Sequence, residues 1–182
     1  ARNGHSGAVK LLLKAGADAE HCDGPGMTPV IYATANGHKE ILKMLIDAGA
    51  DVNAASASGF TAFMAAAGYR GPEIIDVLLE HGADIGMKDQ SGRTALHFAM
   101  YRNDPYNGKD EFLPVVRRLI ENGADLNARD NGGRTPLDIL KERDPDIYSK
   151  HADELKALFS LQKRIQAEDR CKKNDTGFEF DI

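Results

Sequence analysis

The sequence predicts an all-α solenoid of stacked helix–turn–helix units with short turn hairpins. Three observations support this fold class: a tripeptide that recurs at a fixed period, a second motif with the same period, and a hydrophobic stripe of helical spacing in each unit. The glycine content agrees with a repeated turn, because 18 of the 182 residues are glycine. That fraction is about a tenth, whereas globular domains contain about 7%.

The two motifs define the repeat. Gly-Ala-Asp occurs four times, at spacings of 33, 33 and 41 residues, beginning at Gly16, Gly49, Gly82 and Gly123. Gly-x-Thr-(Pro/Ala) follows in the same steps, beginning at Gly26, Gly59, Gly92 and Gly133. Two independent motifs that share one period and one interruption indicate an internal repeat. The predicted units cover about 1–22, 23–55, 56–88, 89–129 and 130–160.

Each unit is expected to contain two short antiparallel helices. Thr28 and Thr135 suit the N-cap of a first helix, and the prolines that follow them suit its first position. The second helix has apolar residues spaced four apart, with a leucine between them that completes one buried stripe. These stripe residues are Val9/Leu12/Leu13, Leu42/Leu45/Ile46, Ile75/Leu78/Leu79 and Val116/Leu119/Ile120. One unit cannot bury such a stripe alone, so the units are expected to stack.

The units resemble the ankyrin repeat. Thr94-Ala95-Leu96-His97 and Asn36-Gly37-His38 match that family closely, and the resemblance covers residues 1 to about 160. It implies a right-handed stack whose concave face, formed by turn tips and the exposed sides of the first helices, binds proteins. Residues 161–182 are then the end of a capping helix and a C-terminal tail. Because residue 1 falls inside an expected first helix, the chain is expected to be a fragment or processed form of a longer protein.

Some segments depart from the pattern. Ser56 replaces a turn aspartate, and Arg70-Gly71-Pro72 replaces a Gly-His pair, where Pro72 is expected to begin a helix. Pro114 is expected to do the same in the fourth unit. The insertion at 103–110 is either a tolerated surface loop or a finger beside the binding face. The last unit is expected to hold a helix over 137–143 and a longer capping helix over about 147–168. The tail, 172–182, is either frayed or a short extended segment.

Composition and motifs argue against several functions. The net charge of −5 argues against nucleic-acid binding, and no apolar run is long enough to cross a membrane. Phosphate-binding glycine loops, Cys-x-x-Cys pairs and metal-ligand spacings of histidine are not found, so we expect no catalysis, metal or cofactor. Cys22 and Cys171 read as reduced thiols of a cytoplasmic or nuclear protein. The chain alone is expected to be monomeric.

Recognition is therefore the expected function. The resemblance places several residues on the concave face that folding does not explain. Four of them are apolar or aromatic and four are arginines: Met27, Phe60, Tyr69 and Tyr101, with Arg93, Arg102, Arg134 and Arg143. Aromatic residues and arginine are enriched in binding hot spots. The ligand would be a protein or peptide with apolar and acidic groups. Alternatively, Arg93 and Arg134 only pair with Asp89 and Asp130 in their own turns.

Two further points rest on the resemblance. Asn53 and Asn127 lie in the sequence context that an asparaginyl hydroxylase uses in ankyrin repeats; otherwise they are turn residues that bond their own backbone. The chain is either a stand-alone adaptor that binds a separate partner, or a regulatory segment of a larger enzyme, channel or scaffold that acts in cis.

Overall fold

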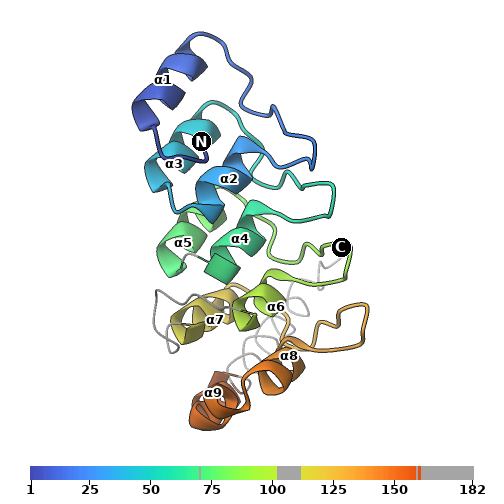
Figure 1. Cartoon of the computed structure of the whole chain (residues 1–182). Helices are drawn as coiled ribbons and strands as arrows, with labels where there is room; N and C mark the ends of the chain where they lie inside the picture. The colour runs from blue at the N-terminus through green and yellow to red at the C-terminus, as the bar shows by residue number, and fades with distance from the viewer. Residues whose placement is uncertain (70, 102–111, 159, 161–182) are drawn as a thin grey trace, which may run out of the picture.

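The computed structural model describes residues 1–69, 71–101, 112–158 and 160. In this part of the chain the helices pack in pairs, and the pairs stack in one row (Figure 1). The helices are α1 (Ser6–Lys14), α2 (Pro29–Ala35), α3 (Lys39–Asp47), α4 (Ala62–Tyr69), α5 (Pro72–Glu80), α6 (Ala95–Met100), α7 (Phe112–Glu121), α8 (Pro136–Arg143) and α9 (Pro145–Lys150). Residues 152–158 are also helical. Within these ranges no strand forms, which confirms the all-α class.

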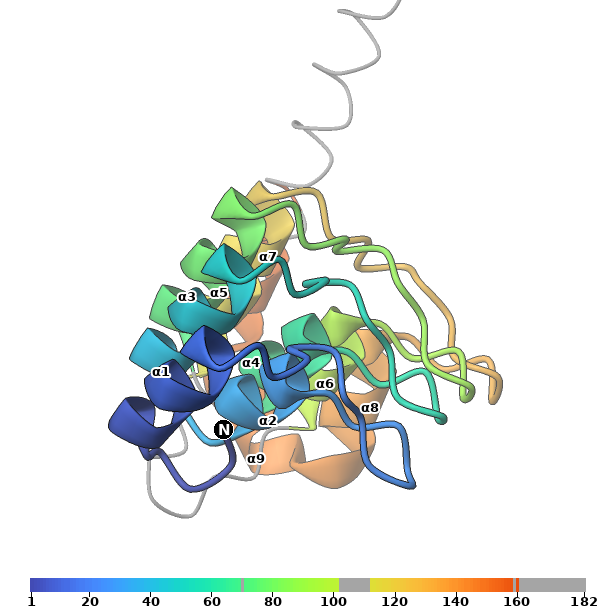
Figure 2. The same ribbon diagram turned by 90° about the horizontal axis from the view of Figure 1, so that it is seen from above.

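Two rows of helices and one row of turns make up the stack. The first helices α2, α4, α6 and α8 pack on one another in an inner row, and α3, α5 and α7 lie behind them. The turns project sideways from both rows, so that the molecule has an L-shaped section when it is viewed from above (Figure 2). The inner angle, between the turns and the inner row, is the concave face. This face continues from one unit to the next.

The first helices begin where the sequence predicts. Thr28 Oγ1 accepts a hydrogen bond from the backbone N–H of Ile31, with Pro29 at the first helical position. Thr135 and Asp138 form a reciprocal capping box, in which each side chain accepts from the other residue's backbone N–H. Hydrogen bonds from the backbone N–H and hydroxyl of Thr135 lower the pKa of Asp138. Both caps satisfy backbone donors that a helix end leaves free.

His97 fixes the start of α6 and joins two units. Its Nδ1 lies 3.1 Å from the backbone nitrogen of Thr94, and its Nε2 lies 3.2 Å from the carbonyl oxygen of Arg134. Because the first contact needs an acceptor and the second a donor, the ring is neutral with its proton on Nε2. The side chain is fully buried, and burial lowers its pKa.

Glycine ends the second helices. Gly82 and Gly123 have φ values of 79° and 92°, the left-handed region in which a side chain is unfavourable. The next turn is closed by backbone hydrogen bonds, for example from Asp89 N–H to Arg93 O and back from Gly92 N–H to Asp89 O. In the third unit Ser56 takes the place of the aspartate, and its Oγ accepts from the N–H of Phe60. The predicted turn hairpins are therefore present.

One part of the predicted hydrophobic stripe is wrong. Leu45, Leu78 and Leu119 are 2%, 0% and 0% exposed, as expected for a core. Leu12 occupies the same repeat position but is 59% exposed, and its neighbour Leu11 is 70% exposed. The physical reason is that α1 packs on α3, whereas α3, α5 and α7 each also pack on a first helix of their own unit.

Two predicted helix starts also need correction. The capping helix expected over about 147–168 begins earlier, at Pro145, with the Asp144 side chain accepting from the N–H of Ile147. It is interrupted by a turn at His151 and resumes over 152–158. Pro114 lies inside the first turn of α7, because Phe112 is already helical, whereas Pro72 does begin α5. The insertion at 103–110 and the tail at 172–182 lie outside the described residues.

Candidate functional site

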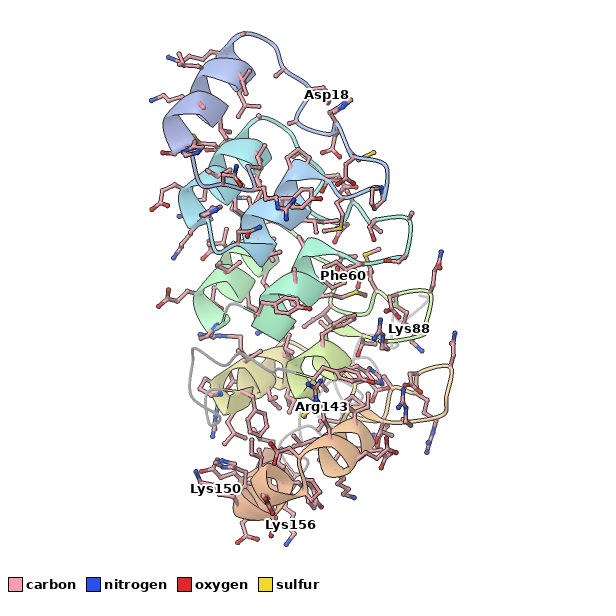
Figure 3. All side chains as sticks on the ribbon, viewed as in Figure 1. Asp18, Phe60, Lys88, Arg143, Lys150 and Lys156 are labelled. Atoms are coloured by element: carbon pink, nitrogen blue, oxygen red, sulfur yellow. The ribbon has the colours of Figure 1, made fainter. Side chains whose placement is uncertain are left out.

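The structure brings four of the predicted site residues together on the concave face. Figure 3 shows Phe60 beside α4 and Arg143 further along the same side of the stack. Arg93 and Tyr101 lie between them at the two ends of α6, and Phe98 of α6 completes the set. We call these five residues, Phe60, Phe98, Arg93, Tyr101 and Arg143, the aromatic–arginine ladder.

The ladder is continuous from the third unit to the fifth. The rings of Phe60 and Phe98 meet edge to face, with centroids 5.3 Å apart. The guanidinium carbon of Arg93 lies 4.7 Å from the centroid of Phe98 and 5.9 Å from that of Tyr101. The guanidinium carbon of Arg143 also lies near Tyr101, 5.3 Å from the ring centroid. Each cation–π contact of this kind is worth about 0.5–2 kcal/mol, so the side chains hold one another in place.

Arg143 also ties the fifth unit to the fourth. Its Nη1 donates a hydrogen bond of 2.8 Å to the backbone oxygen of Tyr101. Within the described part of the chain Arg143 makes no ion pair with a carboxylate. Arg143 is exposed.

Arg93 and Arg134, the other two predicted site arginines that the structure describes, are paired within their own turns. Arg93 Nη2 lies 2.6 Å from Asp89 Oδ2, and Arg134 Nη2 lies 2.8 Å from Asp130 Oδ2. Both carboxylates are nearly inaccessible, with side-chain exposures of 4% and 2%. Burial opposes the ionisation of Asp130, yet hydrogen bonds from the backbone N–H and guanidinium of Arg134 lower its pKa. The pairing that the alternative expected is thus present at both residues, and their contact with a partner stays a prediction.

For Met27 and Tyr69 the structure shows no ring or cation–π contact with the ladder. Met27 is half-buried and lines a cavity near α1, and Tyr69 is 50% exposed at the end of α4. Arg102 lies outside the described residues. Phe60, expected on the surface, is half-buried because it packs against Phe98. Sequence reasoning missed Phe98, although one signal was available: it stands at the repeat position of Tyr32, on the inner helix of its unit.

The turn tips are bonded to one another. The backbone N–H groups of Ala57, Gln90 and Asn131 donate to carbonyl groups in the preceding turn, to Pro25, Ser58 and Ser91 respectively. The side chains of Gln90 and Asn131 repeat these links, with bonds of 2.6 and 2.8 Å to backbone oxygens. The tips therefore form a rigid wall of the concave face, because their polar groups already have partners within the stack.

The two asparagines predicted as hydroxylation sites differ in structure. Asn53 bridges to the next turn, where its Nδ2 donates to Gly82 O at 3.0 Å and its Oδ1 accepts from Asp84 N–H at 2.7 Å. Its side chain thus bonds the following unit and not its own turn. Asn127 is exposed, and its backbone N–H donates to Asp125 Oδ1. Modification of either residue stays a prediction.

The described residues show no group of His, Cys, Asp and Glu side chains that could hold a metal ion. They also include no helix long and apolar enough to cross a membrane. Cys22 is a free, exposed thiol.

The repeat geometry agrees with a comparison to protein families. A family model described as ankyrin repeats (3 copies) matches residues 1–89 and 70–169. The chain therefore belongs to the ankyrin repeat family. No curated protein matches it. Ankyrin repeats are generally protein–protein interaction modules and are generally non-catalytic.

Proposed function

We propose that this chain is a non-catalytic interaction module that binds a protein or peptide on the aromatic–arginine ladder. The observation that carries the proposal is the ladder itself, which spans three units on one face. Folding explains the buried stripe and the capping residues, but it does not require stacked aromatic and arginine side chains on the concave face. Binding hot spots are enriched in these residue types.

The pairing of the arginines defines the chemistry of the ligand. Arg93 and Arg134 are neutralised by buried carboxylates, so a ligand gains little by placing an acidic group beside them. Among the described residues Arg143 is the ladder's cation without a carboxylate partner, and a carboxylate of the ligand would pair with it. Apolar or aromatic side chains of the ligand would pack on Phe60 and Tyr101. The ligand is thus mainly apolar, with an acidic group at the end nearest the fifth unit.

The contacts within the ladder also favour tight binding. A side chain that is already held by its neighbours loses little conformational freedom when a ligand orders it, and that loss commonly costs about 0.5–1.5 kcal/mol for each mobile side chain. Arg93 is held by a hydrogen bond to Asp89 and by its contact with the ring of Phe98. We place the module in the cytoplasm or nucleus, where a free thiol such as Cys22 persists.

Peptide display tests this proposal. Peptides selected from a random library on the immobilised chain would be measured by surface plasmon resonance against Tyr101→Ala and Arg143→Ala. Lys43→Ala, an exposed position on α3 outside the concave face, is the matched control. We expect Tyr101→Ala to weaken binding at least about tenfold, mainly through a faster off-rate, because truncation of a hot-spot residue often costs 2 kcal/mol or more.

Arg143→Ala should reduce the on-rate and its dependence on salt, because a rim charge acts mainly on diffusional encounter. Circular dichroism would confirm that each variant remains helical. If peptides bind all three variants with the affinity of the original chain, the ligand does not use the ladder and the proposal is wrong.

A further inference from the structure

The two turns that frame the aromatic–arginine ladder use all their backbone donors within the stack. Every backbone N–H group of residues 89–94 donates to an acceptor in the chain, and the same holds for residues 130–135. One side-chain oxygen of Asp89 and one of Asp130 each accept two of these bonds. The main chain of a ligand therefore finds no row of donors along these turns.

This satisfied wall limits the backbone that a ligand can have. An extended backbone, whether a strand or a polyproline helix, leaves its carbonyl groups without internal partners. On this wall those groups would lose water without gaining a hydrogen bond, which is unfavourable. An α-helix bonds its own backbone and presents side chains. The inner angle between the turns and the inner row of helices is open to such a helix (Figure 2).

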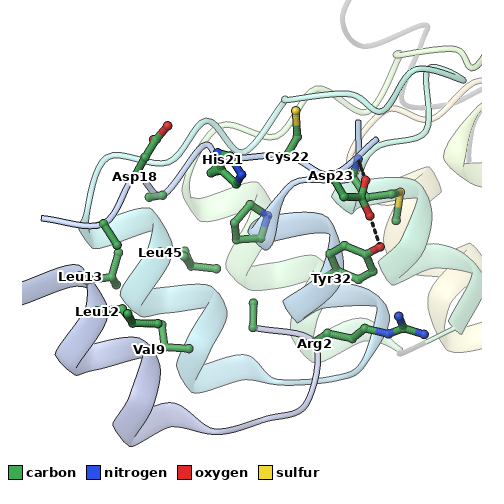
Figure 4. Close-up of a pocket in the computed structure, with 15 residues that line it drawn as sticks. Arg2, Val9, Leu12, Leu13, Asp18, His21, Cys22, Asp23, Tyr32 and Leu45 are labelled. Carbon is green, nitrogen blue, oxygen red and sulfur yellow. Dashed lines mark hydrogen bonds between the residues drawn. The ribbon is translucent and has the colours of Figure 1, made fainter. Parts of the chain in front are cut away.

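The other end of the stack shows how this chain holds a carboxylate beside a tyrosine and an arginine. The hydroxyl of Tyr32 donates a hydrogen bond to the carboxylate of Asp23 (Figure 4). The guanidinium carbon of Arg2 lies 5.7 Å from the centroid of the same ring. The hydrogen bond from Tyr32 is the main cause that lowers the pKa of Asp23, so this arrangement favours an ionised acid.

Tyr101 and Arg143 repeat this arrangement without the carboxylate. The guanidinium carbon of Arg143 lies 5.3 Å from the ring centroid of Tyr101, close to the spacing of Arg2 and Tyr32. Within the described residues, the hydroxyl of Tyr101 donates no hydrogen bond and Arg143 pairs with no carboxylate. A carboxylate supplied by a ligand would therefore find a hydroxyl donor and a cation together.

We propose that the partner of the ladder presents an amphipathic α-helix with a carboxylate in its last turn, an inference that rests on the proposed function. Packed helices lie about 8–10 Å apart, so the three units of the ladder span about 16–20 Å. A helix covers that span with about 11–13 residues. Its apolar side chains at i, i+4 and i+7 pack on Phe60 and the ring of Tyr101. A glutamate at i+11 then reaches the hydroxyl of Tyr101 and the guanidinium of Arg143.

The direction of the helix follows from the charge of Arg143. The last carbonyl groups of a helix have no donors within it and carry a partial negative charge. The end that carries these carbonyl groups therefore lies nearest Arg143, at the fifth unit. The acidic side chain belongs to the same turn, where Arg143 offsets the repulsion between its charge and the helix dipole.

Two competing peptide libraries test the helix. One has a helix-forming background of alanine, glutamine and lysine and is randomised at i, i+4, i+7 and i+11. The other is randomised at alternate positions of an extended background that contains proline. We expect the immobilised chain to select binders from the helical library, with an acidic residue at i+11. Proline in the middle of these binders should weaken them at least about a hundredfold, whereas proline at the first helical position should have little effect.

The outcomes separate this inference from the proposed function. Failure of the helical library to yield binders, or an interior proline without effect, would overturn the helix. If binders from the extended library lose affinity for Tyr101→Ala, the ladder remains the binding surface and only the helix is wrong. Binders that keep their affinity for Tyr101→Ala would refute the proposed function itself.

A double-mutant cycle tests the carboxylate. Tyr101→Phe keeps the ring and removes the hydroxyl, so it should weaken a helical binder with glutamate at i+11 about tenfold. It should leave the same peptide with glutamine at i+11 unaffected. Tyr148→Phe on α9 is the matched control, because its ring lies against Lys141. Equal effects of Tyr101→Phe on the two peptides would overturn the carboxylate site.

Discussion

Two leucines at the same repeat position should respond very differently to truncation. Leu78 is 0% exposed, so Leu78→Ala removes a fully buried side chain and leaves a cavity between the units. Such a change costs about 2–5 kcal/mol in the free energy of unfolding. Leu12 is 59% exposed, so only about two-fifths of its side chain is buried. Full burial of a leucine is worth about 1.5–3 kcal/mol, which puts the cost of Leu12→Ala near 1 kcal/mol.

Urea denaturation followed by circular dichroism measures both changes. Leu78→Ala should lower the urea midpoint well below that of the original chain, and Leu12→Ala should lower it only slightly, with similar slopes of the transition. Leu45→Ala should behave like Leu78→Ala, because Leu45 is 2% exposed. Equal losses of stability at Leu12 and Leu78 would refute the assignment of α1 to an uncovered end of the stack.

Three other predictions follow from particular contacts. His97 is buried and neutral with a lowered pKa, so as the pH falls the unfolded state takes up a proton at His97 before the folded state does. The free energy of unfolding should therefore fall as the pH drops below about 6.5, and in urea titrations from pH 8 to 5 His97→Gln should make this dependence on pH weaker. Gly92→Ala should lower the midpoint of thermal unfolding more than Gly82→Ala does. Both glycines have a positive φ, but a Cβ at position 92 would also lie 2.5 Å from Asn131 Oδ1, whereas a Cβ at position 82 has no atom within 4 Å. Asn53→Ala should lower the free energy of unfolding by about 1–2 kcal/mol in urea denaturation, because it removes two hydrogen bonds between units. Asn127→Ala should change it by less than about 0.5 kcal/mol. Equal effects of the two substitutions would mean that the bridge at Asn53 contributes nothing to stability.

Local chemistry explains why much of the fold was predictable from the sequence. Thr28 and Thr135 cap helices, and Gly82 and Gly123 end them, because these roles depend on residues a few positions apart. The same reasoning failed where the outcome depends on a distant neighbour. Leu12 matches the stripe, but its burial requires a helix packed over it, and its own periodicity contains no information about that helix.

The candidate site was predictable only in part. The repeat frame gave the positions of Phe60, Tyr101 and Arg143, but not that a stacked ladder connects them. Phe98 was missed because its spacing marks it as a core residue, and only the structure shows that it contacts both Phe60 and Arg93. The charge available to a ligand was overestimated for a similar reason, since an arginine four residues from an aspartate can either point outward or bend back into its turn.

The central claim, that the concave face binds the partner, is tested most directly by hydrogen exchange of the chain with and without a selected peptide. The proposed function predicts that added protection appears in α4 and α6 and in the turns at 89–94 and 130–135, which frame the aromatic–arginine ladder. The exchange of α3 and α5, on the other side of the stack, should be unchanged. Protection confined to α3, α5 and α7 would contradict the claim and would move the binding surface to the opposite face.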